Sequence, residues 1–134
     1  MNIIADTNLW VRFFTRDDEE QAQKVDDIFA RADKIILPSN VLCELVWVLS
    51  FSYQFKPDVI FDRLEKLCRN PKIILKNDEV SFGLKMLQNN GDFADGINAF
   101  AGQEMAVGQA ASFVSFDRKA VKLLKRLGRN ATAL

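Results

Sequence analysis

Asn2-Ile3-Ile4-Ala5-Asp6 begins the chain with a short apolar run that ends in a carboxylate. A short apolar run of this kind, ended by polar residues, is typical of a buried strand, here over 2–6. Similar short runs predict further strands at 34–37, 72–75 and 111–115. Between them, apolar residues at helical spacing predict helices at 8–14, 18–32, 40–53, 57–69, 77–88, 93–107 and 118–127.

Strands that alternate with helices indicate an α/β fold with a mostly parallel sheet covered by helices on both faces. No repeat, linker or low-complexity segment interrupts the alternation, so we expect a single domain over 1–134. The helix at 40–53 is apolar almost all round, which predicts that it is buried. We expect a capping box at Asp17-x-x-Glu20, a cap at Ser39, and either a short edge strand or a frayed end at 130–134.

Four stretches place a carboxylate among apolar residues: Asp6, Glu44, Asp95 with Asp92 beside it, and Asp117. Glu44, for example, is the only charged residue in 41–51. A desolvated carboxylate is costly unless a counter-charge, hydrogen bonds or a metal satisfies it. Because functional groups collect at the carboxyl ends of parallel strands, these acids can converge at one edge of the sheet. We therefore expect all five carboxylates to ligate one or two Mg²⁺ or Mn²⁺ ions, since these metals prefer oxygen ligands.

Each acid also has a purely structural interpretation. Asp6 could form a turn with Asn8, and Glu44 could pair with an arginine from elsewhere in the fold. Asp92 is typical of a helix N-cap, and Asp95 could interact with the dipole of a first helical turn. Asp117 could serve as an N-cap, as a metal ligand or as both. Supporting hydrogen bonds to the acids or to metal-bound water are expected from Thr7, Asn8 and Ser115.

Composition excludes several classes of enzyme. The chain has no histidine, which excludes Ser-His-Asp and Cys-His nucleophilic sites and His-ligated zinc. The charges balance overall, but residues 118–134 hold six basic side chains and no acidic one. This basic end would suit a polyanion, although it is equally typical of a solvated last helix. Cys43 and Cys68 lie among apolar residues, which favours reduced thiols in the cytoplasm over a disulfide, and no signal peptide or membrane span is visible.

At these residues the chain resembles the PIN-domain ribonucleases, in particular the VapC-type toxins of bacterial toxin–antitoxin pairs. The resemblance rests on Ala5-Asp-Thr-Asn8, Val11-Arg-Phe-Phe-Thr-Arg-Asp-Asp18, Pro38-x-x-Val-Leu-x-Glu44, Asp92-Phe-Ala-Asp95 and Phe113-Val-Ser-Phe-Asp117. It implies a three-layer α/β/α sandwich with a mostly parallel sheet of four or five strands. It also implies a Mg²⁺- or Mn²⁺-dependent endoribonuclease whose catalytic acids are Asp6, Glu44 and Asp95, with Asp117 as the fourth.

The resemblance implies partners as well. Proteins of this family cut tRNA, rRNA or mRNA, inhibit translation and usually form homodimers. A cognate VapB-type antitoxin neutralises them in a higher oligomer, and DNA is contacted only indirectly, through that antitoxin.

Two other functions compete with this interpretation. A phosphatase of the haloacid-dehalogenase type places a second Asp two residues after the first, whereas Thr7 and Asn8 follow Asp6 here. No Gly-rich phosphate loop of the GxxxxGK[ST] type is present either. A non-catalytic binding module is disfavoured because every expected acid is present.

Overall fold

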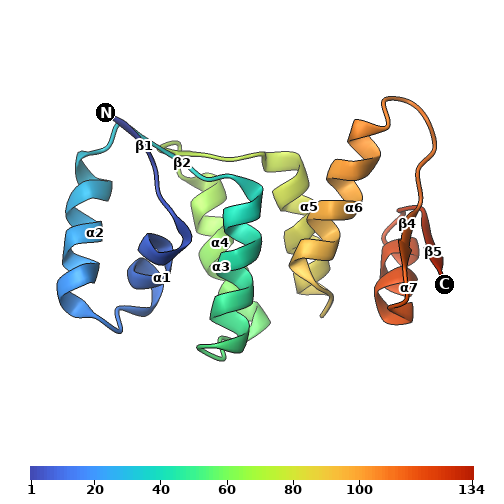
Figure 1. The fold of residues 1–134 in the computed structure, drawn as a ribbon, viewed down its shortest axis with the longest axis horizontal. Coiled ribbons are helices and arrows are strands. Elements are labelled where there is room, and N and C mark those ends of the chain that lie inside the picture. Colours follow the sequence, from blue (N-terminus) through green and yellow to red (C-terminus); the bar gives the residue numbers. More distant parts are fainter. The chain divides into compact units, whose positions relative to one another are not determined.

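Strands and helices alternate along the whole chain in the computed structural model, which describes residues 1–134 (Figure 1). The predicted α/β class is confirmed, with seven helices and five short strands. In chain order the elements are β1 (Asn2–Ile4), α1 (Thr7–Thr15), α2 (Glu19–Arg31), β2 (Lys34–Ile36), α3 (Ser39–Phe51), α4 (Pro57–Arg69), β3 (Ile73–Ile74), α5 (Asn77–Gln88), α6 (Phe93–Met105), β4 (Phe113–Ser115), α7 (Arg118–Arg126) and β5 (Ala131–Ala133).

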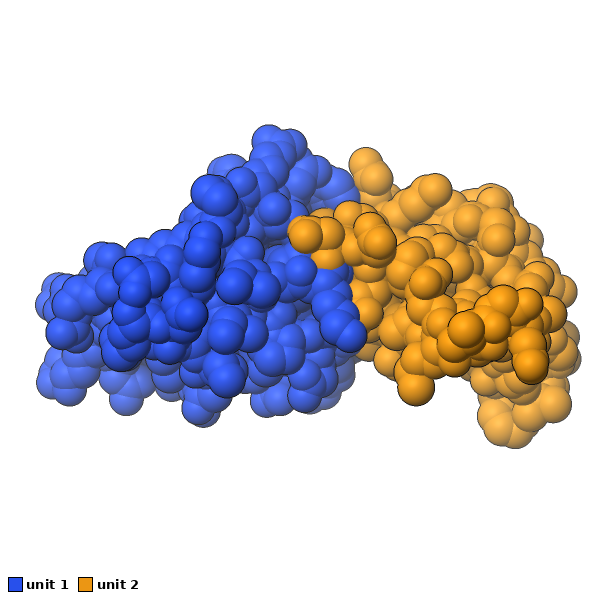
Figure 2. All heavy atoms as spheres, turned by 90° about the horizontal axis from the view of Figure 1, so that it is seen from above, with its two compact units in different colours: residues 1–76 blue, residues 77–134 orange.

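The chain divides into two compact units, residues 1–76 and 77–134, which Figure 2 colours separately. All strand pairs are parallel, as the alternation predicts. The first unit holds a three-stranded sheet in the order β1-β2-β3, and the second holds the pair β4-β5. The final strand of the chain is therefore β5, which settles the alternative that 130–134 left open.

Aromatic side chains form the core beneath the first sheet. Trp10 of α1 is almost completely buried, and its ring centroid lies 4.7 Å from that of Phe29 in α2. Phe13 and Phe14 of α1 pack against the same tryptophan. This cluster joins α1 to α2, so the crossover between β1 and β2 is held by aromatic contacts.

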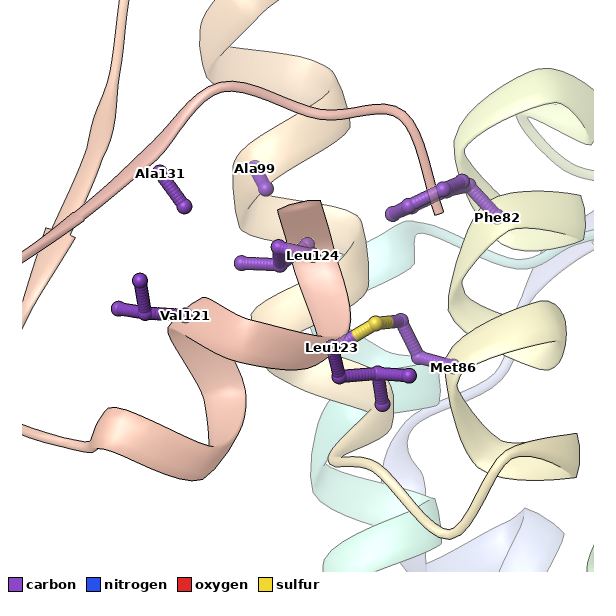
Figure 3. Packing of buried hydrophobic residues seen from close by; sticks show 7 residues of the cluster. All are labelled: Phe82, Met86, Ala99, Val121, Leu123, Leu124 and Ala131. Atoms are coloured by element: carbon purple, nitrogen blue, oxygen red, sulfur yellow. The ribbon is translucent and has the colours of Figure 1, made fainter. Parts of the chain in front are cut away.

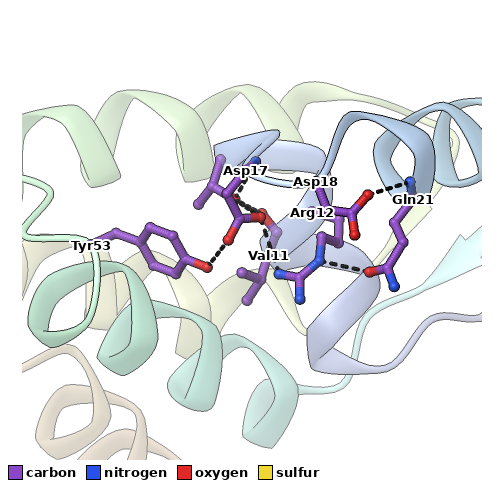
Figure 4. Close-up of polar contacts among 7 residues, drawn as sticks. Val11, Arg12, Asp17, Asp18, Gln21 and Tyr53 are labelled. Carbon is purple, nitrogen blue, oxygen red and sulfur yellow. Dashed lines mark hydrogen bonds and ion pairs between the residues drawn. The ribbon is translucent and has the colours of Figure 1, made fainter.

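Polar contacts fix the turn between α1 and α2, as Figure 4 shows. Asp18, not Asp17, caps α2 by accepting a hydrogen bond from the backbone N–H of Gln21 at 3.1 Å. Asp17 instead accepts hydrogen bonds from Arg12 and from the hydroxyl of Tyr53. The predicted capping box is thus wrong by one residue, because the side chain of Asp17 is taken by these partners.

The second unit is built around α7, whose apolar face packs on α5, α6 and β5. Figure 3 shows this cluster, which comprises Phe82, Met86, Ala99, Val121, Leu123, Leu124 and Ala131. In α7 the buried positions are 120, 121, 123 and 124, so the opposite face carries the basic side chains. This strong amphipathicity explains why the sequence locates the helix so well.

Helices α5 and α6 touch through glycines. A Cβ added to Gly96 would lie 2.6 Å from Cγ of Met86 and 3.0 Å from Cα of Gly83. A Cβ added to Gly83 would likewise lie 2.8 Å from the ring of Phe93. The two helices therefore approach more closely than any other residue type would allow, directly after Asp95 in the chain.

Burial differs from the prediction at two elements. Strand β1 is not buried, since Asn2 and Ile4 are exposed. Helix α3 is not buried all round either, because Trp47 and Phe51 are 58% and 68% exposed and their rings pack on each other. Only one face of α3 enters the core, through Leu42, Leu45, Val46 and Leu49.

Two smaller predictions also have an outcome. Ser39 is the first residue of α3 and makes no capping hydrogen bond. Cys43 and Cys68 form no disulfide, and both are half-buried.

Among the helices, none combines the length and apolar character needed to cross a membrane.

Candidate functional site

Asp92 and Asp95 lie at the start of α6. Asp92 is the N-cap, as predicted, and its carboxylate accepts a hydrogen bond from the backbone N–H of Asp95 at 2.9 Å. Asp92 is exposed, whereas Asp95 in the first turn is half-buried. The apolar neighbours of Asp95 thus produce the partial desolvation that the sequence indicates.

Asp117 lies at the start of α7. Its carboxylate caps the helix by accepting a hydrogen bond from the backbone N–H of Ala120 at 3.1 Å. The hydroxyl oxygen of Ser115 accepts a hydrogen bond from the backbone N–H of Asp117 at 3.0 Å. Ser115 therefore contacts Asp117 through the backbone and helps to fix where the cap begins.

One pocket of about 560 Å³ in the second unit brings three of the predicted acids together. Asp92, Asp95 and Asp117 line it, so the N-terminal ends of α6 and α7 open into the same hollow. Helix N-termini carry partial positive charge, which favours carboxylates there. The capping bonds leave carboxylate oxygens of these residues available for a further partner.

The charge of Asp95 is not balanced by the protein. Burial, followed by the nearby charges of Asp92 and Asp117, raises the pKa of Asp95 to about 6. A carboxyl group with two acidic neighbours and no cation partner favours its protonated form. A bound cation would reverse this preference, because it stabilises the ionised carboxylate.

Basic side chains line the same pocket. They belong to the exposed face of α7 and are Lys119, Lys122 and Arg126. Sequence reasoning identified the basic end of the chain only as a whole and missed these three as pocket residues. Their spacing of three and four residues places them on one face of the predicted helix, but Arg118, Lys122 and Lys125 have a similar spacing, so spacing alone does not single them out.

Asp6 and Glu44 lie in the first unit. Asp6 caps α1 by accepting a hydrogen bond from the backbone N–H of Leu9 at 3.3 Å, so it does not form the turn with Asn8. Glu44 lies in the second turn of α3, a helix that packs against α1. Both side chains are exposed, so the expectation that apolar neighbours desolvate them is wrong. Of the two predicted supporting residues here, Thr7 is buried and Asn8 is exposed.

The structure thus gathers Asp92, Asp95 and Asp117 into one pocket, with Ser115 hydrogen-bonded to the backbone of Asp117. Asp6, Glu44, Thr7 and Asn8 belong to the other unit. No group of three or more His, Cys, Asp or Glu side chains closes around a point where a metal ion could be held. The pocket offers carboxylate and amide oxygens and no thiol or imidazole, and this donor set fits Mg²⁺ or Mn²⁺ better than softer metals.

Comparison with known proteins adds the family. No curated protein and no solved structure matches the chain. The family model of the PIN domain matches residues 3–96, which is well over half of the chain and includes Asp6, Glu44, Asp92 and Asp95. PIN domains are generally nucleases that bind divalent metal ions. The chain therefore belongs to the PIN domain family.

Proposed function

We propose that the protein is a Mg²⁺- or Mn²⁺-dependent endoribonuclease toxin of the VapC type. The observation that carries the proposal is the half-buried carboxylate of Asp95, which lies beside Asp92 and Asp117 in one pocket of a PIN-domain chain. An uncompensated carboxylate of this kind favours a divalent cation as its partner. Hydrolysis of an RNA phosphodiester is the reaction that such a site would serve.

The acids hold the metal in this proposal. Asp95, Asp117, Asp6 and Glu44 are the proposed catalytic metal ligands, and Asp92 either joins them or acts only as the cap of α6. A bound divalent metal would polarise the phosphate of the substrate and lower the pKa of a water molecule. Asp95 must give up its proton before it can ligate, so its raised pKa couples metal binding to pH. Ser115 holds the backbone of Asp117 in place throughout.

Several finer features belong to the proposal. They are a three-layer α/β/α sandwich with a sheet of four or five strands, a homodimer, and action in the cytoplasm on tRNA, rRNA or mRNA. Neutralisation by a VapB-type antitoxin, in a higher oligomer that contacts DNA only through that antitoxin, completes it. The basis for these features is the ordered set of sequence motifs together with membership of the PIN family.

The test is cleavage of a total-RNA pool by the purified protein with Mg²⁺, with Mn²⁺ and with EDTA. Discrete products that require metal and disappear in Asp95→Asn and in Asp6→Asn would support the proposal. Glu104→Gln is the matched control, because Glu104 is an exposed acid near the other end of α6. Cleavage that survives unchanged in both aspartate variants would contradict the proposed mechanism.

A further inference from the structure

Helix α7 presents a basic stripe to the acidic pocket. The stripe consists of Lys119, Lys122 and Arg126, which line the pocket together with Asp92, Asp95 and Asp117. Residues three, four and seven apart lie on one face of a helix. Seven residues of helix rise about 10 Å, so the stripe is an extended feature and not a point charge.

The cations of the stripe have no partner within the protein. No ion pair or side-chain hydrogen bond in the structure involves them, although three carboxylates line the same pocket. By contrast, Lys24 of α2 and Lys66 of α4 form ion pairs with Glu20 and Asp62 of their own helices. Helix α7 contains no acidic residue at all, so its pocket-facing charge is left for an external anion.

The other basic residues near the C-terminal end of the chain do not line this pocket. The guanidinium of Arg129 lies over the rings of Phe100 and Phe82, at 4.3 and 4.9 Å from their centroids, and donates a hydrogen bond to Gln103. Arg129 therefore has a structural role. Lys125 lines a different pocket, and Arg118 lines none of those described, although both are exposed residues of α7. The stripe thus contains only those basic residues of α7 that line the acidic pocket.

The two ends of the pocket differ in what they attract. The carboxylates at the N-terminal ends of α6 and α7 repel a phosphate unless a cation lies between them, whereas the stripe attracts phosphates directly. In a stacked nucleic-acid strand one phosphate recurs about every 3.4 Å along the axis, so a stripe about 10 Å long spans two or three of them. A nucleic-acid strand that is cut at one phosphate near the carboxylates and bound at the neighbouring phosphates by the stripe would fit this pocket.

We propose that Lys119, Lys122 and Arg126 bind the phosphates of the substrate strand that flank the one at the carboxylates, so that α7 positions single-stranded RNA for cleavage. This inference rests on the proposed nuclease function. Contacts to phosphate carry no base specificity, so the stripe contributes affinity and position and leaves the choice of sequence to other residues.

The test compares two double variants of α7 that each remove two positive charges. Lys122→Ala with Arg126→Ala alters the stripe, and Arg118→Ala with Lys125→Ala is the control. Binding of a fluorescent single-stranded RNA is measured by anisotropy in EDTA over a range of salt. Every protein in this assay also carries Asp95→Asn and Asp117→Asn, so that these carboxylates do not repel the strand and neither metal nor cleavage is needed. On a single strand, each lost phosphate contact makes the negative slope of log affinity against log salt shallower by about 0.7. We therefore expect the slope to become shallower by about 1.4 in the stripe variant only.

Three results would overturn the inference. They are a protein with the intact stripe that does not bind RNA in this assay, equal slope changes in both double variants, and polyglutamate of the same charge that competes as well as RNA does. Matching circular-dichroism spectra and melting temperatures of the variants exclude unfolding as the cause. If the stripe variant alone loses slope but wild type cuts no RNA with any metal, the RNA contact stands and the nuclease function fails.

Discussion

The backbone N–H of Asp95 donates a hydrogen bond to the carboxylate of Asp92, so the acid that caps α6 also lies against the acid whose pKa it raises. The cap stabilises the helix, while its charge opposes ionisation of Asp95. The carboxylate of Asp92 thus acts both on the start of the helix, through this hydrogen bond, and on the protonation of Asp95, through its charge. This arrangement makes the effect of pH on stability predictable in sign.

We expect the metal-free protein to lose stability as the pH rises, through Asp95. Its pKa is raised from 3.8 to about 6 in the folded protein, so the folded state holds the proton more tightly than the unfolded state. That contribution is complete below 3.8 and disappears as the pH rises through 6. In EDTA the melting temperature of Asp95→Asn should therefore rise relative to that of wild type as the pH increases from 3.8 to about 6. A constant difference between the two proteins would show that folding does not raise the pKa of Asp95.

Substitutions at Asp92 should separate its capping role from its charge. Asn is as good an N-cap as Asp, so Asp92→Asn keeps the helix stable while it lowers the pKa of Asp95. Asp92→Ala removes both the cap and the charge, and the loss of the cap should cost about 1 kcal/mol of stability. Carboxyl titration by NMR and thermal unfolding measure the two effects. Because Asp92 raises the pKa of Asp95 more than Asp117 does, Asp117→Asn should lower it less, and the reverse order would contradict this electrostatic account.

The sequence predicts the elements well because their signals are local. Periodic apolar residues and capping acids locate α6 and α7, and the predicted N-caps at Asp92 and Asp117 are confirmed by hydrogen bonds to their own helices. Burial is harder to predict, because it depends on what lies opposite a side chain. Glu44 shares an apolar stretch with Trp47, yet both are exposed, since α3 offers only one face to the core.

The close approach of α5 and α6 was also beyond the reach of sequence patterns. Gly96 contacts Gly83, which lies thirteen positions earlier, and no local periodicity links the two. The partial burial of Asp95 agrees with its apolar neighbours in the sequence, but the same signal fails at Glu44, so local sequence alone does not decide burial. The grouping of Asp95 with Asp117 depends on packing between α6 and α7, which the sequence indicates only through the general position of the acids.

A methyl group at Gly96 should disturb the pocket through the helix that carries Asp95. The added Cβ of Gly96→Ala would lie 2.6 Å from Cγ of Met86 and 3.0 Å from Cα of Gly83, so α5 and α6 must separate. Such overpacking typically costs about 1–3 kcal/mol. Gly102→Ala in the same helix is the control, since nothing lies within 4 Å of its added Cβ and the exchange should stabilise the helix by about 0.5–1 kcal/mol. Denaturant unfolding measures both, and equal effects would mean that the contact at Gly96 is not tight.

Divalent metal should stabilise the protein by relieving the repulsion among its pocket acids. A ligand that binds only the folded state adds about 2.7 kcal/mol at a concentration a hundredfold above its Kd, so Mg²⁺ or Mn²⁺ should raise the melting temperature. Asp95→Asn should lose most of this shift, because it removes the half-buried carboxylate. Glu104→Gln should keep it, since that exposed acid lies near the opposite end of α6. If wild type and Asp95→Asn respond equally to millimolar metal, or neither responds, the acids of this pocket do not form a metal site in the isolated protein, and the shared role that the sequence assigns to them would have to be abandoned.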